Sequence, residues 1–235
     1  MKTNENILVL FDIDGTILSP GAGARRSLSQ ALFEVIGTET KIKAGDCAGK
    51  TDPVIISNVL KIDGNVTGDF ESILFRTKSR YLELLEQNYN KDGDAFLYTG
   101  VMEIIEKLNE MSGVYLALLT GNFEEGARIK LSPFGLNELF PTGAFGSDGF
   151  LRTELTPVAV KRSEELFNVK FAPNNIVVIG DTASDIECGK VINARTIGIS
   201  QHLRNEDTLK AADPDFVFRG FENTDDVLKA ILNSN

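Results

Sequence analysis

Acidic and polar residues follow three apolar, strand-like runs in this sequence, each at the point where the run ends. The runs are Ile7–Phe11, Val114–Leu119 and Ile176–Ile179, and their composition is typical of strands buried on both faces of a parallel sheet. The residues that follow them are Asp12 and Asp14, then Thr120, Gly121 and Asn122, and finally Asp181 and Asp185. Since ligands bind at the carboxyl ends of such strands, we expect these side chains to converge on one crevice.

Four carboxylates in one crevice repel one another, and each raises the pKa of its neighbours. A bound divalent cation relieves this repulsion, and a set of ligands that offers only oxygen atoms favours Mg²⁺. The alternative is that the acids only cap helices and turns, which is common for a single Asp at a strand end. Four acids at two strand ends favour the metal site.

The elements that position these residues alternate between strand and helix. Two further short strands are predicted at Thr196–Ile199 and Phe216–Phe218, and Val101, Ile104, Ile105 and Leu108 have helical spacing. This alternation predicts a doubly wound, Rossmann-like α/β core with a parallel sheet.

Residues 19–96 interrupt the alternation, because they contain no convincing buried strand. Helical patterns are predicted instead at Ala24–Ile36, Pro53–Leu60 and Phe70–Glu86. We therefore expect a small helical lid at 19–96, inserted into a core domain made of 1–18 and 97–235.

Composition narrows the possible partners and cofactors. The net charge of −10 argues against nucleic-acid or anionic-membrane partners. His202 is the one histidine, which leaves no material for a His-based zinc site or a Ser-His-Asp triad. Cys47 and Cys188 are predicted to be reduced thiols. The apolar run near the N-terminus is too short for a membrane span and lacks the cleavage region of a signal peptide, so we expect a cytoplasmic protein. The sequence does not indicate the oligomeric state.

Three segments resemble a known family. F-D-I-D-G-T (Phe11–Thr16), L-L-T-G-N (Leu118–Asn122) and G-D-T-A-S-D-I (Gly180–Ile186) are similar to motifs one, two and four of the haloacid dehalogenase superfamily. The layout resembles the phosphoglycolate phosphatase-like and β-phosphoglucomutase-like branch, whose helical cap occupies the place of the predicted lid. The resemblance implies a Mg²⁺-dependent hydrolase that acts on a small phosphorylated metabolite through an aspartyl-phosphate.

The same resemblance implies roles for the four acids. Asp12 corresponds to the nucleophile, and Asp14 to the general acid and base. The metal would be held by the carboxylates of Asp12 and Asp181 and by the backbone carbonyl of Asp14. Asp185 would support this metal site.

Two other groups are expected to hold the substrate. By resemblance, Thr120 and the backbone amides of Gly121 and Asn122 would bind the transferring phosphoryl oxygens. Thr120 as an ordinary helix N-cap is the alternative. Lys50 lies in a glycine-containing turn of the cap that would face the substrate, although it could equally be a solvated loop residue.

The active-site cation departs from the family pattern, which places a lysine just before a core helix. Thr156 and Pro157 predict the start of that helix, so the lysine position falls near Arg152. Lys161 has the expected residue type, but it lies about 200° around the helix from Ala159 on the predicted buried face. We therefore favour Arg152.

Three other functions use related chemistry. A sugar-phosphate mutase needs the same pair, Asp12 and Asp14, and the sequence does not separate it from a phosphatase. A 2-haloacid dehalogenase needs neither Asp14 nor a metal. A signalling receiver module also groups acids around Mg²⁺, but it has no insertion as long as 19–96.

Overall fold

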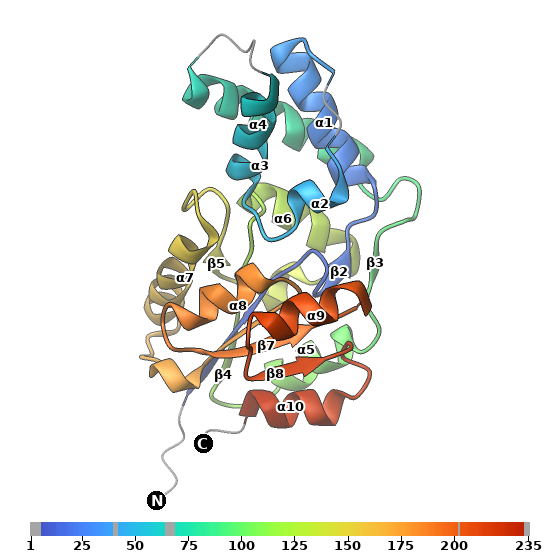
Figure 1. Ribbon diagram of the computed structural model, residues 1–235. Helices are drawn as coiled ribbons and strands as arrows, with labels where there is room; N and C mark the ends of the chain where they lie inside the picture. The colour runs from blue at the N-terminus through green and yellow to red at the C-terminus, as the bar shows by residue number, and fades with distance from the viewer. Residues whose placement is uncertain (1–5, 40–41, 64–68, 202, 233–235) are drawn as a thin grey trace, which may run out of the picture.

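Six parallel strands form the centre of the protein in the computed structural model, which describes residues 6–39, 42–63, 69–201 and 203–232 (Figure 1). The strand order is β5-β4-β1-β6-β7-β8. Their bounds are β1 Ile7–Phe11, β4 Val114–Leu119, β5 Gly143–Ala144, β6 Ile176–Gly180, β7 Arg195–Ile199 and β8 Phe216–Phe218. This sheet confirms the predicted doubly wound α/β core. His202 lies outside the described residues.

Helices cover both faces of the sheet, which explains why the strands are apolar at consecutive positions. In β1, Val9 and Phe11 pack into one apolar cluster, and Leu8 and Leu10 into another on the opposite face. The first face is covered by α5 (Val101–Asn109), α6 (Glu124–Leu131) and α10 (Thr224–Leu232), and the second by α7 (Arg152–Phe167) and α8 (Ala183–Lys190). Helix α9 (Leu203–Ala211) precedes β8, and short 3₁₀ turns occupy Ser132–Phe134, Asn137–Leu139 and Pro173–Asn175. The carboxyl ends of the strands thus meet at one edge of the sheet.

A helical cap stands over the sheet in Figure 1. It consists of α1 (Gly23–Ile36), α2 (Ala44–Cys47), α3 (Asp52–Asp63) and α4 (Phe70–Asn88). The chain enters through β2 (Leu18–Ser19) and leaves through β3 (Phe96–Leu97), and these two strands pair antiparallel. The expected helical cap after the first strand is confirmed, whereas the division at 18/19 and 96/97 into separate domains stays a prediction.

Helix α7 begins five residues earlier than the sequence predicts. It starts at Arg152 rather than at Pro157, which lies inside the helix. The backbone N–H of Leu151 donates to Glu154 Oε2 at 3.0 Å, so the helix is capped there. The prediction from Thr156 and Pro157 was therefore wrong: the helix begins upstream of the proline, where Leu151 is capped and the side chains of Arg152 and Leu155 are buried.

The two cysteines show no sign of reactivity. Cys47 is half-buried, Cys188 is buried, and neither forms a disulfide. Burial raises the pKa of Cys47 to about 11 and that of Cys188 to about 12, so both thiols stay protonated at neutral pH.

None of the helices in the described part of the chain has the length and apolar character to cross a membrane. The cytoplasmic location stays a prediction.

Candidate active site

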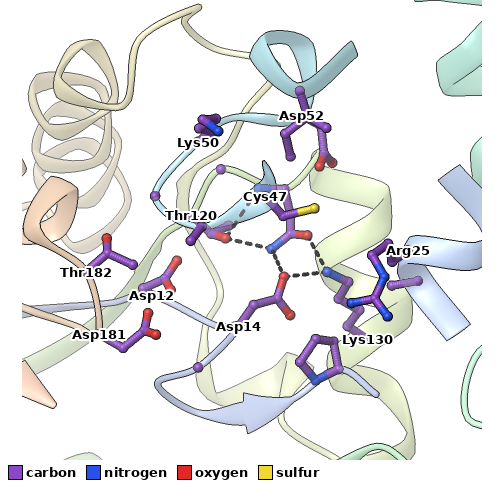
Figure 2. Close-up of a pocket in the computed structure, with 18 of the residues that line it drawn as sticks. Asp12, Asp14, Arg25, Cys47, Lys50, Asp52, Thr120, Lys130, Asp181 and Thr182 are labelled. Carbon is purple, nitrogen blue, oxygen red and sulfur yellow. Dashed lines mark hydrogen bonds and ion pairs between the residues drawn. The ribbon is translucent and has the colours of Figure 1, made fainter. Parts of the chain in front are cut away.

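Three carboxylates meet at the carboxyl edge of the sheet, and two of them, Asp12 and Asp181, are labelled in Figure 2. Asp12 follows β1, Asp181 follows β6, and Asp185 lies in the first turn of α8. One ligand oxygen from each carboxylate lies within 4.8 Å of the other two. Parallel pairing of β1 with β6 produces this arrangement, because it places the ends of the two strands side by side.

Gly15 makes the close approach of Asp181 to the first loop possible. Its φ of +92° belongs to the left-handed region that glycine favours, and a Cβ there would lie 2.2 Å from Asp181 Oδ2. Asp181 Oδ1 is buried and has no hydrogen-bond partner among the described residues. A buried carboxylate oxygen without a donor is costly unless a cation occupies the space beside it.

The pKa shifts of the cluster are in the direction that a bound cation would oppose. Burial raises the pKa of Asp12 to about 7; Arg152 opposes the rise, and Asp185 and Asp14 add to it. Burial, Asp185 and Asp12 raise the pKa of Asp181 well above its usual value. Because these donors are all oxygen atoms, the site fits a small, hard cation such as Mg²⁺.

Arg152 is the cation that the structure places against the carboxylates. Its Nη2 donates to Asp12 Oδ1 at 2.9 Å and also pairs with Asp185 Oδ1. Its position at the start of α7 buries the side chain, which is 6% exposed. The rival residue, Lys161, is 77% exposed and lies 3.9 Å from Glu165. Arg152 alone of the two can therefore act on Asp12.

Asp14 is held by a separate set of contacts on the other side of the cavity (Figure 2). Its Oδ2 accepts hydrogen bonds from Lys130 Nζ and from Asn122 Nδ2, the latter at 3.0 Å. Lys130 Nζ also donates to Asn122 Oδ1 at 2.6 Å, and Asn122 Nδ2 donates to Thr120 Oγ1 at 2.8 Å. Asp14 Oδ1 is buried without a hydrogen-bond partner in the described chain. One oxygen of Asp14 is thus fixed by two hydrogen bonds, and the other accepts none from the described residues.

Lys130 is the site residue that the sequence reasoning missed. Its side chain is only 4% exposed, and it lies on the buried face of α6 together with Ala127 and Leu131. The sequence did contain a signal: Ala127, Lys130 and Leu131 are spaced i, i+3 and i+4, which places the lysine on the same helix face as two apolar residues. A buried ammonium group of this kind is normally paired, and here its partner is Asp14.

The predicted residues surround one cavity of about 270 Å³ between the core and the cap. All of them line it except Asp185, which lies behind Arg152 and accepts hydrogen bonds from Thr182. Lys50 enters from the cap, and its Nζ donates to the backbone oxygen of Asp46 at 2.8 Å. The cavity volume suits a small ligand.

A parallel α/β core with clustered carboxylates under a helical cap is the architecture expected for the class of capped hydrolases that the three motifs resemble. The chain belongs to the haloacid dehalogenase-like hydrolase family, whose model matches residues 9–190. The resemblance of the three motifs and the expectation of a hydrolase are thereby confirmed.

Proteins that are similar over nearly the whole length carry two names. A phosphoglycolate phosphatase of Vibrio vulnificus is 25% identical over 92% of this chain and 93% of its own. A pyrophosphatase PpaX of Halalkalibacterium halodurans is 24% identical over 94% and 95%. The structure of a predicted phosphoglycolate phosphatase from Haemophilus somnus superposes with a TM-score of 0.71 at 20% identity, covering 97% of this chain and all of that one. This last likeness concerns the fold.

Proposed function

We propose that the protein is a Mg²⁺-dependent phosphatase that hydrolyses a small phosphomonoester through an aspartyl-phosphate on Asp12. The observation that carries the proposal is that Asp12, which Arg152 holds, and Asp14, which Lys130 and Asn122 hold, line the same cavity. The names of the relatives, phosphoglycolate phosphatase and pyrophosphatase, support phosphoryl chemistry on a small substrate.

In the first half of the reaction, a carboxylate oxygen of Asp12 attacks phosphorus and the bond to the leaving oxygen breaks. Arg152 holds Asp12 Oδ1, so Oδ2 is the oxygen free to attack. Asp14 gives its proton to the leaving oxygen, which departs as the alcohol.

In the second half, water attacks the phosphorus of the aspartyl-phosphate and loses a proton to Asp14. Inorganic phosphate leaves, and Asp12 is restored. Thr120 and the amides of Gly121 and Asn122 would bind the phosphoryl oxygens throughout, and Lys50 would contact the substrate from the cap.

The carboxylates of Asp12 and Asp181 and the backbone carbonyl of Asp14 would hold Mg²⁺, and Asp185 would support them. When bound, Mg²⁺ supplies positive charge beside the carboxylates and the phosphoryl oxygens. The residues themselves position the substrate and move the protons.

The proposal is tested by incubation with p-nitrophenyl phosphate and Mg²⁺. Catalytic release of p-nitrophenol together with inorganic phosphate is expected. A receiver module would be phosphorylated once at most, and a mutase would return the phosphoryl group to a sugar. Failure to turn over this ester and a panel of metabolite phosphates would reject the proposal.

Magnesium is expected to stabilise the protein as well as to activate it. At a concentration of roughly 100 times the dissociation constant, binding adds about 2.7 kcal/mol. This should raise the melting temperature by several degrees, at about 2–4 °C per kcal/mol for a chain of this size. The increase should be larger at about pH 8 than at about pH 5, because below its pKa of about 7 Asp12 must first lose a proton.

Differential scanning calorimetry with Mg²⁺ and with EDTA measures this effect, and Asp181→Asn should abolish it. The exposed Asp213→Asn change in the same protein serves as the control, since its side chain is 94% exposed. A wild-type melting temperature that is unaffected by Mg²⁺ at either pH would contradict the metal site.

Substitution of Lys130 by Met is expected to impair the protonation of the leaving group. Without Lys130, Asp14 Oδ2 keeps only the hydrogen bond from Asn122. The carboxyl group of Asp14 is then less firmly positioned for proton transfer. We expect kcat/KM to fall on the order of tenfold or more for an alkyl phosphate, whose alkoxide needs a proton. The fall should be smaller for p-nitrophenyl phosphate, because p-nitrophenolate leaves without one. Lys130→Arg should restore part of the loss, and equal losses with both substrates would argue against this role.

A further inference from the structure

The loop Thr120–Phe123, between β4 and α6, is bound from the cap side by one residue, Asp52. The backbone N–H of Asp52 donates to Gly121 O at 2.8 Å. In the reverse direction, Asp52 Oδ2 accepts a hydrogen bond from the backbone N–H of Phe123, also at 2.8 Å. Asp52 therefore binds the residues on both sides of Asn122, and the side chain of Asn122 contacts both Thr120 and Asp14.

The cap backbone packs directly against the backbone of this loop at Gly121. A Cβ on Gly121 would lie 2.1 Å from Lys50 O, so any side chain at this position would displace the cap segment. Beside it, Thr51 Oγ1 donates to Phe150 O at 2.7 Å, just before Arg152 begins α7. The Lys50–Asp52 segment thus touches the two core segments that carry the phosphoryl donors and the active-site cation.

The side chain of Phe123 belongs to the cap rather than to the core. It is 1% exposed and packs in the apolar cluster of the cap with Leu28 and Leu85. Its ring lies 6.4 Å from that of Tyr81. Phe123 therefore contacts the cap through both its ring and its backbone N–H.

An acidic residue such as Asp52 is unusual at a buried position whose only role is packing. It is 6% exposed, and burial raises the pKa of its carboxyl group to about 6. Lys130 lowers this pKa and Asp14 raises it, so Asp52 lies within the electrostatic range of both. A buried carboxylate costs free energy that a simple apolar contact would not.

We propose that Asp52 is a positioning residue that fixes the Thr120–Phe123 loop for phosphoryl binding only when the cap is seated on the core. Contact of the cap with the core and ordering of the phosphoryl-binding donors then occur together, which completes the site around the substrate. This inference rests on the proposed function, because it assigns the loop to the phosphoryl group.

The test compares Asp52→Ala and Asp52→Asn in the full-length protein. The alanine variant loses the acceptor for the Phe123 N–H, whereas the oxygen of asparagine retains it. We expect Asp52→Ala to weaken inhibition by inorganic phosphate, and to lower kcat/KM for p-nitrophenyl phosphate, on the order of tenfold or more. Asp52→Asn should recover most of both losses.

Asp46→Ala is the matched control. Asp46 also lies in the cap and also accepts a backbone N–H, that of Lys43 at 2.7 Å, but it is exposed. This variant should bind phosphate and turn over substrate as the wild type does.

Binding of inorganic phosphate is also measured without turnover, from the increase that it causes in the melting temperature in the presence of Mg²⁺. If the wild type hydrolyses no phosphate ester, the proposed function fails, and this binding measurement still reports on the loop. Unchanged phosphate affinity in Asp52→Ala would overturn the inference, even if the variant were less stable. An Asp52→Asn variant as impaired as Asp52→Ala would overturn it too, because the hydrogen bond would not be what matters.

Discussion

Asp12→Asn is expected to abolish turnover, with kcat reduced by at least ~10³-fold. An amide is a poor nucleophile, and the substitution also removes one of the oxygen ligands of the proposed metal site. Arg152 would keep a hydrogen bond to the amide oxygen, so the fold should survive. Steady-state hydrolysis of p-nitrophenyl phosphate measures the loss, and circular dichroism confirms folding.

The preparation of this variant must be free of deamidated protein, because conversion of the introduced asparagine back to aspartate restores the wild type. Mass spectrometry of the peptide that contains position 12 provides this control. Turnover near the wild-type rate in a deamidation-free sample would remove Asp12 from the role of nucleophile.

Arg152→Ala is expected to lower kcat on the order of 10²-fold or more. The guanidinium group is the one positive charge that contacts both Asp12 and Asp185 in the described structure, and all three side chains are buried. Removal of one partner from a buried ionic cluster also costs about 3–5 kcal/mol of folding free energy. Rates should therefore be measured well below the melting temperature of the variant.

Two further variants test whether the charge, the guanidinium geometry and the position of Arg152 each matter. Arg152→Lys should recover part of the rate, because it restores the charge but not the planar guanidinium group. Lys161→Ala should change stability by no more than about 0.5 kcal/mol and leave the rate unchanged, since Lys161 faces solvent. An inactive Lys161→Ala variant beside a normal Arg152→Ala variant would reverse the assignment.

The sequence predicted the core of the site because strand ends in a parallel sheet meet at one edge. Asp12, Asp14, Thr120 and Asp181 each follow a long apolar run, and such runs are recognisable without a structure. The position of Arg152 also followed from local reasoning, although the helix starts earlier than Thr156 and Pro157 suggested.

The contacts that the sequence did not predict depend on tertiary packing. Helix α6, Glu124–Leu131, is short and mostly polar, so neither the helix nor the buried position of Lys130 was expected. Strands β2, β3 and β5 have two residues each, which is too short for a periodic pattern. Asp52 meets the loop at Gly121 and Phe123 only because the cap folds back on the core.

Trapping the covalent intermediate tests the central proposal most directly. Asp14→Asn should still accept the phosphoryl group from p-nitrophenyl phosphate, whose leaving group needs no proton, and then stall because no base activates water. After an acid quench and reduction with borohydride, peptide mass spectrometry should find homoserine at position 12, with one equivalent of p-nitrophenol released per protein. Asp12→Asn provides the blank. Release of stoichiometric p-nitrophenol with unmodified aspartate at position 12 would contradict an aspartyl-phosphate on Asp12.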